Sequence, residues 1–427
     1  MNSRHNNDVP VTWKRLKAER DILTASSRTN LEYHDAMIDP PGKPAVATEP
    51  RLTLVTGFWP QKHELVRTMQ VYTRLFEELV AHVDNALPIV CCIDPRFEAD
   101  VQAVKQRHSD ARLEIRLMSF EELHFARGRE RFADLQPANS SFNLRDTIEY
   151  AIIVWSKAAT VRRIADENPF GTSHFAWIDY GIAHVSQLLD ADWEEIEAMA
   201  TSTDRLRVAE RMGTAKSEIE DPWYFYSTNS ARVCGGLFTG TRERFTELSA
   251  LFDDEIARMV PTGTYALEEQ VLAAVTALRP DMIERWYTDY QGVLTNAAMA
   301  RCDIGTIIAN LDHCRQSDLH EVGADVARFL LRSGEAYAHL LPEQCLHLLD
   351  DGMYCALRAD PELANALAKT ALSLYHYSRV GRGMMKGTWR KSIQASLKEL
   401  GADFPDRPWT WEEFASRADF RVWLSCF

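Results

Sequence analysis

The sequence predicts an α/β fold in which helices flank a mostly parallel sheet, followed by an all-helical carboxyl-terminal region. Short apolar runs that stop at a glycine or a carboxylate alternate with stretches whose apolar residues recur at helical spacing. Strand, helix and strand in succession are typical of right-handed parallel crossover units. From about Arg301 onward, leucine, alanine and charged residues recur at helical spacing without a fixed-period repeat.

The chain of 427 residues is too long for one ordinary core. Residues 1–50 are polar, and the last 14 of them hold four prolines and a glycine, so we expect an arm or linker there. We expect the sheet domain over residues 51–300 and the helical domain over residues 301–427.

The first half of the sheet domain shows strands and helices in alternation. The apolar run from Leu52 to Pro60 opens the sheet, and the helix after it has one apolar face. The elements expected up to the middle of the domain are strands at Leu52–Pro60, Pro88–Asp94, Leu113–Met118 and His174–Ile178, and helices at Glu64–Val80 and Thr147–Ala165.

The second half continues the alternation. A strand at Cys234–Thr241 carries a pair of glycines, which are unusual inside a strand. The other expected elements are a strand at Leu206–Glu210 and helices at Ala191–Ala200, Glu243–Met259 and Ala266–Leu278. Far downstream, Ser378–Lys391 forms a basic, glycine-interrupted loop that is either solvated surface or a phosphate contact.

Composition limits the partners. A formal net charge of −14 disfavours nucleic acid and anionic membrane surfaces. The eight cysteines form no CxxC pair, which is typical of reduced thiols, and no apolar run has the length of a membrane span. We therefore expect a cytoplasmic protein that has no membrane span and does not bind nucleic acid, and a homodimer is one possible assembly.

Acidic residues follow the predicted strands or open a predicted helix. Asp94 and Asp179 each end an apolar run, and Glu268 with Glu269 begins a helix. Together they resemble a nucleotide-sugar site, because a carboxylate-held divalent cation offsets the charge of a diphosphate leaving group. Lys157 is either a further phosphate contact or a helix-surface lysine. Each acid also has a structural alternative, as a turn residue or as a helix first-turn acid.

Several ordered motifs resemble one bacterial family. TLVTGFWP, PIVCCIDPRF, FAWIDYGIAHV, CGGLFTG, EEQVL and WYTDYQGVLTN are similar to the motifs of the HtrL/YibB family, over roughly Arg51 to Asn296. That family is similar to GT-A glycosyltransferases and is commonly associated with surface-polysaccharide loci. The resemblance implies a GT-A-like fold that binds a nucleotide-sugar donor, with manganese or magnesium as the divalent cation.

The resemblance also implies roles for individual residues. The Asp179 segment stands in place of the usual Asp-x-Asp, with Gly181 at the second acidic position. Asp179 would hold the metal, and Glu268 or Glu269 would take the acceptor proton in an inverting reaction, whereas a retaining reaction needs no base. The other implied contacts are Thr56, Gly57 and Phe58 with the nucleotide, Asp94 with the base or ribose, Lys157 with the diphosphate, Gly235 and Gly236 with the donor sugar, and Asp289 and Tyr290 with the closed site.

The leading hypothesis is a glycosyltransferase that moves a sugar from a nucleotide donor to an unidentified saccharide, small molecule or protein. A sugar nucleotidyltransferase is one alternative, although TGFWPQKH lacks the basic glycine-rich phosphate loop that such an enzyme needs. The other is a non-catalytic scaffold with a degenerate donor site, which the glycine at position 181 favours.

Overall fold

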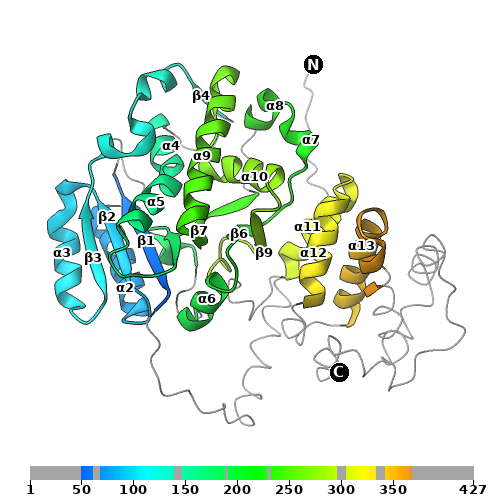
Figure 1. Cartoon of the computed structure of the whole chain (residues 1–427), viewed down its shortest axis with the longest axis horizontal. Helices are drawn as coiled ribbons and strands as arrows, with labels where there is room; N and C mark the ends of the chain where they lie inside the picture. The colour runs from blue at the N-terminus through cyan, green and yellow to red at the C-terminus, as the bar shows by residue number, and fades with distance from the viewer. Residues whose placement is uncertain are drawn as a thin grey trace, which may run out of the picture. The chain divides into compact units, whose positions relative to one another are not determined.

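The computed structural model describes residues 50–60, 68–138, 147–186, 188, 191–227, 232–295, 304–332, 342–364 and 366–367. Its centre is a seven-stranded sheet with the strand order β3-β2-β1-β5-β7-β6-β9 (Figure 1). The strands are β1 (Leu52–Phe58), β2 (Ile89–Ile93), β3 (Leu113–Leu117), β5 (His174–Ile178), β6 (Leu206–Glu210), β7 (Val233–Thr241) and β9 (Ile283–Tyr287).

The sheet is mostly parallel. Strand β7 runs antiparallel to both of its neighbours, β5 and β6, and the other paired strands of this sheet run parallel. A short parallel pair, β4 (Gln136–Pro137) and β8 (Thr264–Tyr265), lies outside it. The predicted fold class, a mostly parallel sheet flanked by helices with helices after it, is confirmed.

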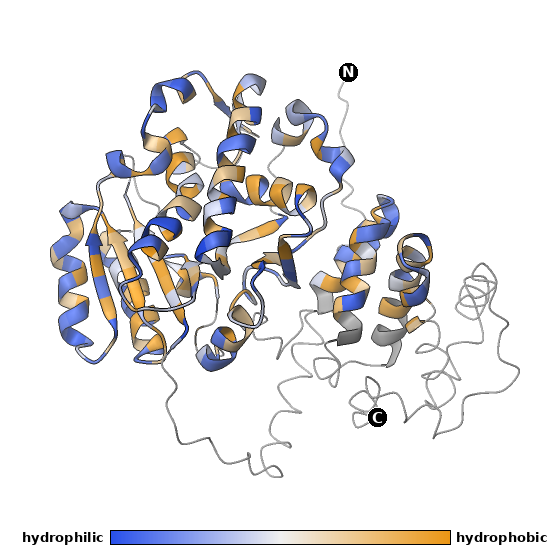
Figure 2. Cartoon of the chain, viewed as in Figure 1, coloured by the Kyte–Doolittle hydropathy of each residue, from blue (hydrophilic) through white to orange (hydrophobic). Residues whose placement is uncertain are grey.

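Alternate residues of the strands enter two hydrophobic clusters, one on each face of the sheet. On β5, Phe175 and Trp177 belong to one cluster, while Ala176 and Ile178 belong to the other. This alternation follows from the two-residue period of a strand, and both faces are apolar because helices cover both. Figure 2 shows the strands as largely hydrophobic, whereas the helices also carry hydrophilic residues.

The helices divide between the two clusters. The cluster with Trp177 includes residues of α4 (Ile148–Trp155), α5 (Lys157–Glu167), α9 (Arg242–Met259) and α10 (Glu268–Leu278). The cluster with Ile178 includes residues of α2 (Met69–Val83), α3 (Glu98–Arg107) and α6 (Trp193–Ala200). Two short helices, α7 (Lys216–Ile219) and α8 (Pro222–Ser227), lie between β6 and β7 in the chain.

The predicted elements of the sheet domain are largely present, and three differences concern its longer helices and the strands of the main sheet. The single helix expected at Thr147–Ala165 is two helices, because α4 ends at Trp155 and α5 begins at Lys157. Helix α3 was not predicted, since it buries only Val101 and Val104 and has almost no apolar stripe. Strand β9 was not predicted either, because its Glu284 and Arg285 interrupt the apolar run.

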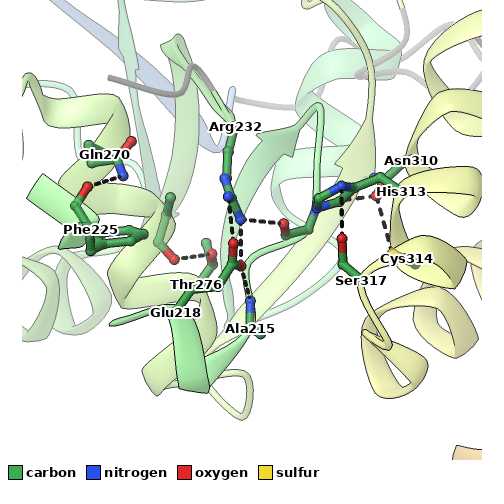
Figure 3. A network of polar contacts seen from close by, with 12 residues as sticks. Ala215, Glu218, Phe225, Arg232, Gln270, Thr276, Asn310, His313, Cys314 and Ser317 are labelled. Atoms are coloured by element: carbon green, nitrogen blue, oxygen red, sulfur yellow. Dashed lines mark hydrogen bonds and ion pairs between the residues drawn. The ribbon is translucent and has the colours of Figure 1, made fainter. Parts of the chain in front are cut away.

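Helices α11 (Ile304–Gln316), α12 (His320–Arg332) and α13 (Pro342–Ala359) follow the sheet. The backbone N–H of Gly213, after β6, donates to Oδ1 of Asn310 on α11 at 3.1 Å. The carbonyl of Gly213 accepts from Arg232 at 2.9 Å, and Arg232 forms a bidentate ion pair with Glu218 (Figure 3). These contacts attach α11 to the segment between β6 and β7. The domain boundary at residue 300 stays a prediction.

Four further sequence predictions concern the polar arm, the basic loop, membrane spans and the cysteines. The polar arm, apart from Pro50, and the basic loop at Ser378–Lys391 lie outside the described residues. Among the helices that the structure describes, none has both the length and the apolar stretch needed to cross a bilayer. The five cysteines whose side chains are described are free and buried: Cys91, Cys92, Cys234, Cys314 and Cys355.

A buried ion pair joins β6 to β9. Nε of Arg285 lies 2.9 Å from Oε2 of Glu210, whose side chain is 2% exposed. Arg285 also donates to the carbonyl of Thr276 at 2.8 Å. Burial raises the pKa of Glu210, and the nearby guanidinium only partly opposes this. The carboxylate of Glu210 therefore depends on Arg285 for its charge compensation.

We expect Arg285→Ala to lower the free energy of unfolding at pH 8 by about 3–5 kcal/mol, because it leaves a buried carboxylate without its partner. The loss shrinks as the pH falls toward 5, since the raised pKa lets Glu210 bind a proton in the folded state before it would in the unfolded state. Urea denaturation at both pH values measures the effect. Arg74→Ala, which removes an exposed pair with Glu78, is the control and changes stability by about 0–1 kcal/mol. Equal small losses in both variants would contradict this account.

Candidate functional site

The strand order changes direction at β1. Strands β2 and β3 extend to one side of β1, whereas β5 pairs with its other side. Ligands of open α/β sheets bind beyond the carboxyl ends of the strands at such a switch point. Asp94 follows β2 and Asp179 follows β5, and the N–H of Asp94 donates to the carbonyl of Phe58 at the end of β1. The predicted strand-end residues therefore lie along one edge of the sheet.

A buried lysine joins three of the predicted site residues. Nζ of Lys157 lies 2.8 Å from Oδ1 of Asp179 and 2.6 Å from Oε1 of Glu268. It also donates to the carbonyl of Gly235 at 3.0 Å. The Lys157 side chain is 5% exposed, and an ammonium group has three protons. These three acceptors match its three protons, so this arrangement leaves none for a diphosphate, and the geometry favours a positioning role.

The local structure places Lys157 inside the protein. The break between α4 and α5 makes it the first residue of α5, on the side that packs against Trp177 and α9. Asp179 directly follows β5, two residues after Trp177, so the two-residue period of a strand directs both side chains to the same face of the sheet. The indole N–H of Trp177 donates to Oδ1 of Asp179 at 2.7 Å, and the ammonium lies 5.5 Å from the centre of the indole ring. Sequence reasoning missed Trp177, although its spacing from Asp179 pointed to the same face.

The two glutamates at the start of α10 have different partners. Glu268 is buried and pairs with Lys157. Oε1 of Glu269 accepts the hydroxyl proton of Tyr290 at 2.5 Å and lies 3.4 Å from the backbone nitrogen of Gly235. Tyr290 was a predicted site residue, and its companion Asp289 instead accepts from the N–H of Gly292 in a turn. The structure therefore separates the pair, with Glu268 held by a cation and Glu269 held by a hydroxyl.

The charges of this cluster shift two pKa values. Burial, together with the neighbouring charge of Glu268, raises the pKa of Glu269 to about 7, while the hydrogen bond from Tyr290 opposes both effects. Burial lowers the pKa of the Lys157 ammonium, but Asp179 and Glu268 outweigh burial, so the pKa ends above its usual value. At neutral pH, Lys157 is charged and Glu269 is poised to gain or lose a proton.

The glycines near the cluster differ in how much space surrounds them. A Cβ on Gly235 would lie 2.4 Å from Oε1 of Glu268, so Glu268 reaches Lys157 only because residue 235 has no side chain. A Cβ on Gly236 would lie 3.1 Å from Ile182 and 3.6 Å from Oδ2 of Asp179. At Gly181 the nearest atoms would be at 3.6 Å, an ordinary contact. Position 181 therefore has room for a side chain, whereas position 235 does not.

Asp94 forms an ion pair with an arginine. Both of its carboxylate oxygens accept from the guanidinium of Arg96, at 2.8 and 2.9 Å. These hydrogen bonds hold the pKa of Asp94 below its usual range. The Asp94 side chain is 8% exposed and that of Arg96 is 59% exposed. The exposed member of the pair is thus a cation, which sequence reasoning missed although it lies two residues after Asp94.

Aromatic side chains gather at the same edge on the other face of the sheet. Phe58 stacks on Tyr180 with ring centres 4.9 Å apart, and Tyr72 and Phe97 lie beside Phe58. Phe58, Tyr72 and Phe97 are half-buried. Thr56 is fully buried, and Gly57 lies against the ring of Trp59. Of the three predicted nucleotide contacts on β1, Phe58 is therefore the one whose side chain reaches the edge.

The side chains around Asp179 do not fit a divalent cation as they stand. Oδ1 of Asp179 already accepts from Trp177 and Lys157, and the described residues contain no group of three side chains suited to hold a metal ion. Two unit charges 4 Å apart repel by about 4 kcal/mol at an effective dielectric constant of about 20, and a divalent cation doubles this repulsion. A metal on Asp179 would face the Lys157 ammonium at close range. The predicted metal role of Asp179 is not supported by this geometry.

Comparison with known proteins identifies the family. A family model described as "Bacterial protein of unknown function (HtrL_YibB)" matches residues 51–290, which is more than half of the chain. The chain therefore belongs to the HtrL/YibB family, as its motifs indicated. No curated protein shows significant sequence similarity to it. A solved structure that it resembles is mouse xyloside xylosyltransferase 1 in its apo form, with 10% identity over 55% of this chain and 84% of that one and a TM-score of 0.32.

We expect Gly235→Ala to lower the free energy of unfolding by about 1–3 kcal/mol, because the new methyl group forces Glu268 away from Lys157. The matched control is Gly181→Ala, whose methyl group meets only ordinary contacts. Its backbone φ is −102°, so the control should leave stability unchanged or raise it by up to about 1 kcal/mol. Thermal and urea unfolding measure both variants, and a tolerated alanine at position 235 would contradict the packing described here.

Proposed function

We propose that this member of the HtrL/YibB family is a glycosyltransferase that transfers a sugar from a nucleotide-sugar donor to an acceptor hydroxyl group. The observation that carries the proposal is the gathering of Asp179, Lys157, Glu268 and Glu269 at the carboxyl edge of the sheet, beside the switch point between β1 and β5. Carboxylates accept hydrogen bonds from the hydroxyl groups of a sugar, and a poised carboxyl group can move a proton.

The nucleotide half of the donor is assigned to the edge near β1 and β2. Phe58 and Phe97 offer half-buried aromatic surface to a base, and the exposed guanidinium of Arg96 offers charge to a diphosphate. The cluster around Lys157 has two carboxylates against one ammonium, so its net charge disfavours a diphosphate. We therefore assign the diphosphate to Arg96 and the sugar to the half-exposed carboxylate of Asp179. The glycine pair lets the backbone of β7 lie close to that sugar.

Glu269 is the group assigned to proton transfer. The acceptor oxygen forms a bond to the anomeric carbon, the bond from that carbon to the diphosphate oxygen breaks, and the acceptor proton passes to the carboxylate of Glu269. Glu268 is less suited to this task because Lys157 already neutralises it. The assignment applies to a reaction that inverts the anomeric centre, since a retaining reaction needs no base.

Nucleotide binding is tested first. At a nucleoside diphosphate concentration of 100 times Kd, we expect the free energy of unfolding to rise by about 2.7 kcal/mol, seen as a higher melting temperature. Arg96→Ala should remove most of the rise. The matched control is Arg107→Ala, which removes a similar bidentate pair between Arg107 of α3 and Glu77 of α2.

A panel of uridine, guanosine, adenosine, cytidine and thymidine diphosphates and their sugars covers the donor classes. If none of them raises the melting temperature and none of the sugars is hydrolysed, the transferase proposal fails and the scaffold alternative takes its place. Binding of nucleoside triphosphates with release of pyrophosphate from a sugar phosphate would instead identify a nucleotidyltransferase.

Proton transfer is tested with the donor sugar that the panel identifies. The rate should fall as the pH drops below about 7, because the raised pKa of Glu269 leaves it protonated there and unable to accept a proton. Glu269→Gln should lower kcat by about 10²–10⁴-fold. Tyr290→Phe removes a hydrogen bond that lowers the pKa of Glu269, so it should move the midpoint of the pH profile upward.

The exposed Tyr224 supplies the control, since Tyr224→Phe should leave the profile in place. A rate that is independent of pH between 5 and 8, together with an active Glu269→Gln variant, would rule out Glu269 as the proton acceptor and indicate a retaining reaction.

A further inference from the structure

The ammonium group of Lys157 has the surroundings of a bound cation. Oxygen atoms of Glu268, Asp179 and Gly235 lie 2.6, 2.8 and 3.0 Å from Nζ. Two carboxylates and a backbone carbonyl are also the oxygen ligands that calcium and magnesium take, at about 2.0–2.6 Å. The three ligands come from α10, the end of β5 and β7, so they converge on one point from separate elements.

We propose that the Lys157 ammonium takes the place of a divalent cation in this chain, so that the site needs no metal ion, and that removing the ammonium uncovers a latent divalent-cation site. The proposal concerns the binding of a metal alone and holds whether or not the chain is a transferase. For the proposed transferase it implies that nucleotide binding is independent of divalent metal.

Several contacts fix the ammonium at this point. The Lys157 side chain and the Glu268 side chain are 5% and 7% exposed, so neither exchanges its partner for water at low cost. The indole ring of Trp177 lies beneath the ammonium, and its N–H holds Asp179 in position. The absence of a side chain at Gly235 leaves room for Glu268 to reach across. A metal ion could take the position of the ammonium only by displacing a buried, fully paired lysine.

Removal of the lysine side chain leaves the two carboxylates without a positive charge. Lys157→Ala leaves the carboxylates of Asp179 and Glu268 facing the volume that the ammonium occupied, with the carbonyl of Gly235 beside them. Two carboxylates without a counter-charge repel each other, and a divalent cation relieves that repulsion. The variant should therefore be less stable than the wild type without metal and should regain stability when manganese is added.

The experiment measures melting temperature and manganese binding by isothermal titration calorimetry on the full chain after treatment with EDTA. The wild type should neither bind manganese at this site nor change its melting temperature between EDTA and about 1 mM manganese, which is the upper end of the dissociation constants of oxygen-ligand calcium sites. Lys157→Ala should bind one manganese ion and melt at a higher temperature in its presence. The double variant Lys157→Ala, Asp179→Asn is the control and should lose the manganese effect.

The proposal would be overturned if the wild type binds manganese and Asp179→Asn abolishes that binding. A folded Lys157→Ala variant that neither binds manganese nor melts at a higher temperature in its presence would also overturn it. If Lys157→Ala is not recovered in folded form, the wild-type titration decides, together with Lys157→Arg, which keeps the positive charge and should ignore manganese. Failure of all nucleoside diphosphates to bind would refute the proposed function but would leave these metal results intact.

Discussion

A single buried ammonium group holds the candidate site together. Without the charge of Lys157, the buried carboxylate of Glu268 would face the half-exposed carboxylate of Asp179 with no counter-charge, which proteins avoid. The ion pairs tie α5, α10 and the end of β5 to the backbone of β7, so the same contact that compensates the charges also fixes the geometry. The proton-accepting candidate, Glu269, lies next to this fixed point and has its pKa raised by burial and by Glu268.

Much of the sheet could be predicted because its strands are short apolar runs with clear ends. β2 and β5 each stop just before a carboxylate and β1 ends one residue after Gly57, and these signals depend only on local sequence. The antiparallel direction of β7 could not be predicted, since strand direction depends on how the intervening chain folds back. Strand β9 was not predicted for another reason. Its Arg285 is buried because it pairs with Glu210, a contact between segments 75 residues apart.

The sequence predicted which residues form the candidate site better than it predicted what each of them does. Asp179, Lys157, Glu268, Glu269 and Gly235 do meet, as acidic strand ends and a helix start at one edge of a sheet suggest. Their pairing could not be predicted, because it depends on a helix break at Ser156 that buries Lys157 and on the missing side chain at Gly235. The family resemblance assigned Thr56 and Asp94 to the nucleotide, and the structure shows that Thr56 is buried and that Asp94 is bound to Arg96.

The central claim is that the carboxyl edge of the sheet at the β1–β5 switch point binds a nucleotide sugar. The most direct measurement is a crystal structure of the chain with the nucleoside diphosphate that raises its melting temperature most. The account predicts the base beside Phe58 and Phe97, the diphosphate near Arg96, and its terminal phosphate directed toward Asp179. A nucleotide bound elsewhere on the protein, with this edge of the sheet left empty, would contradict it.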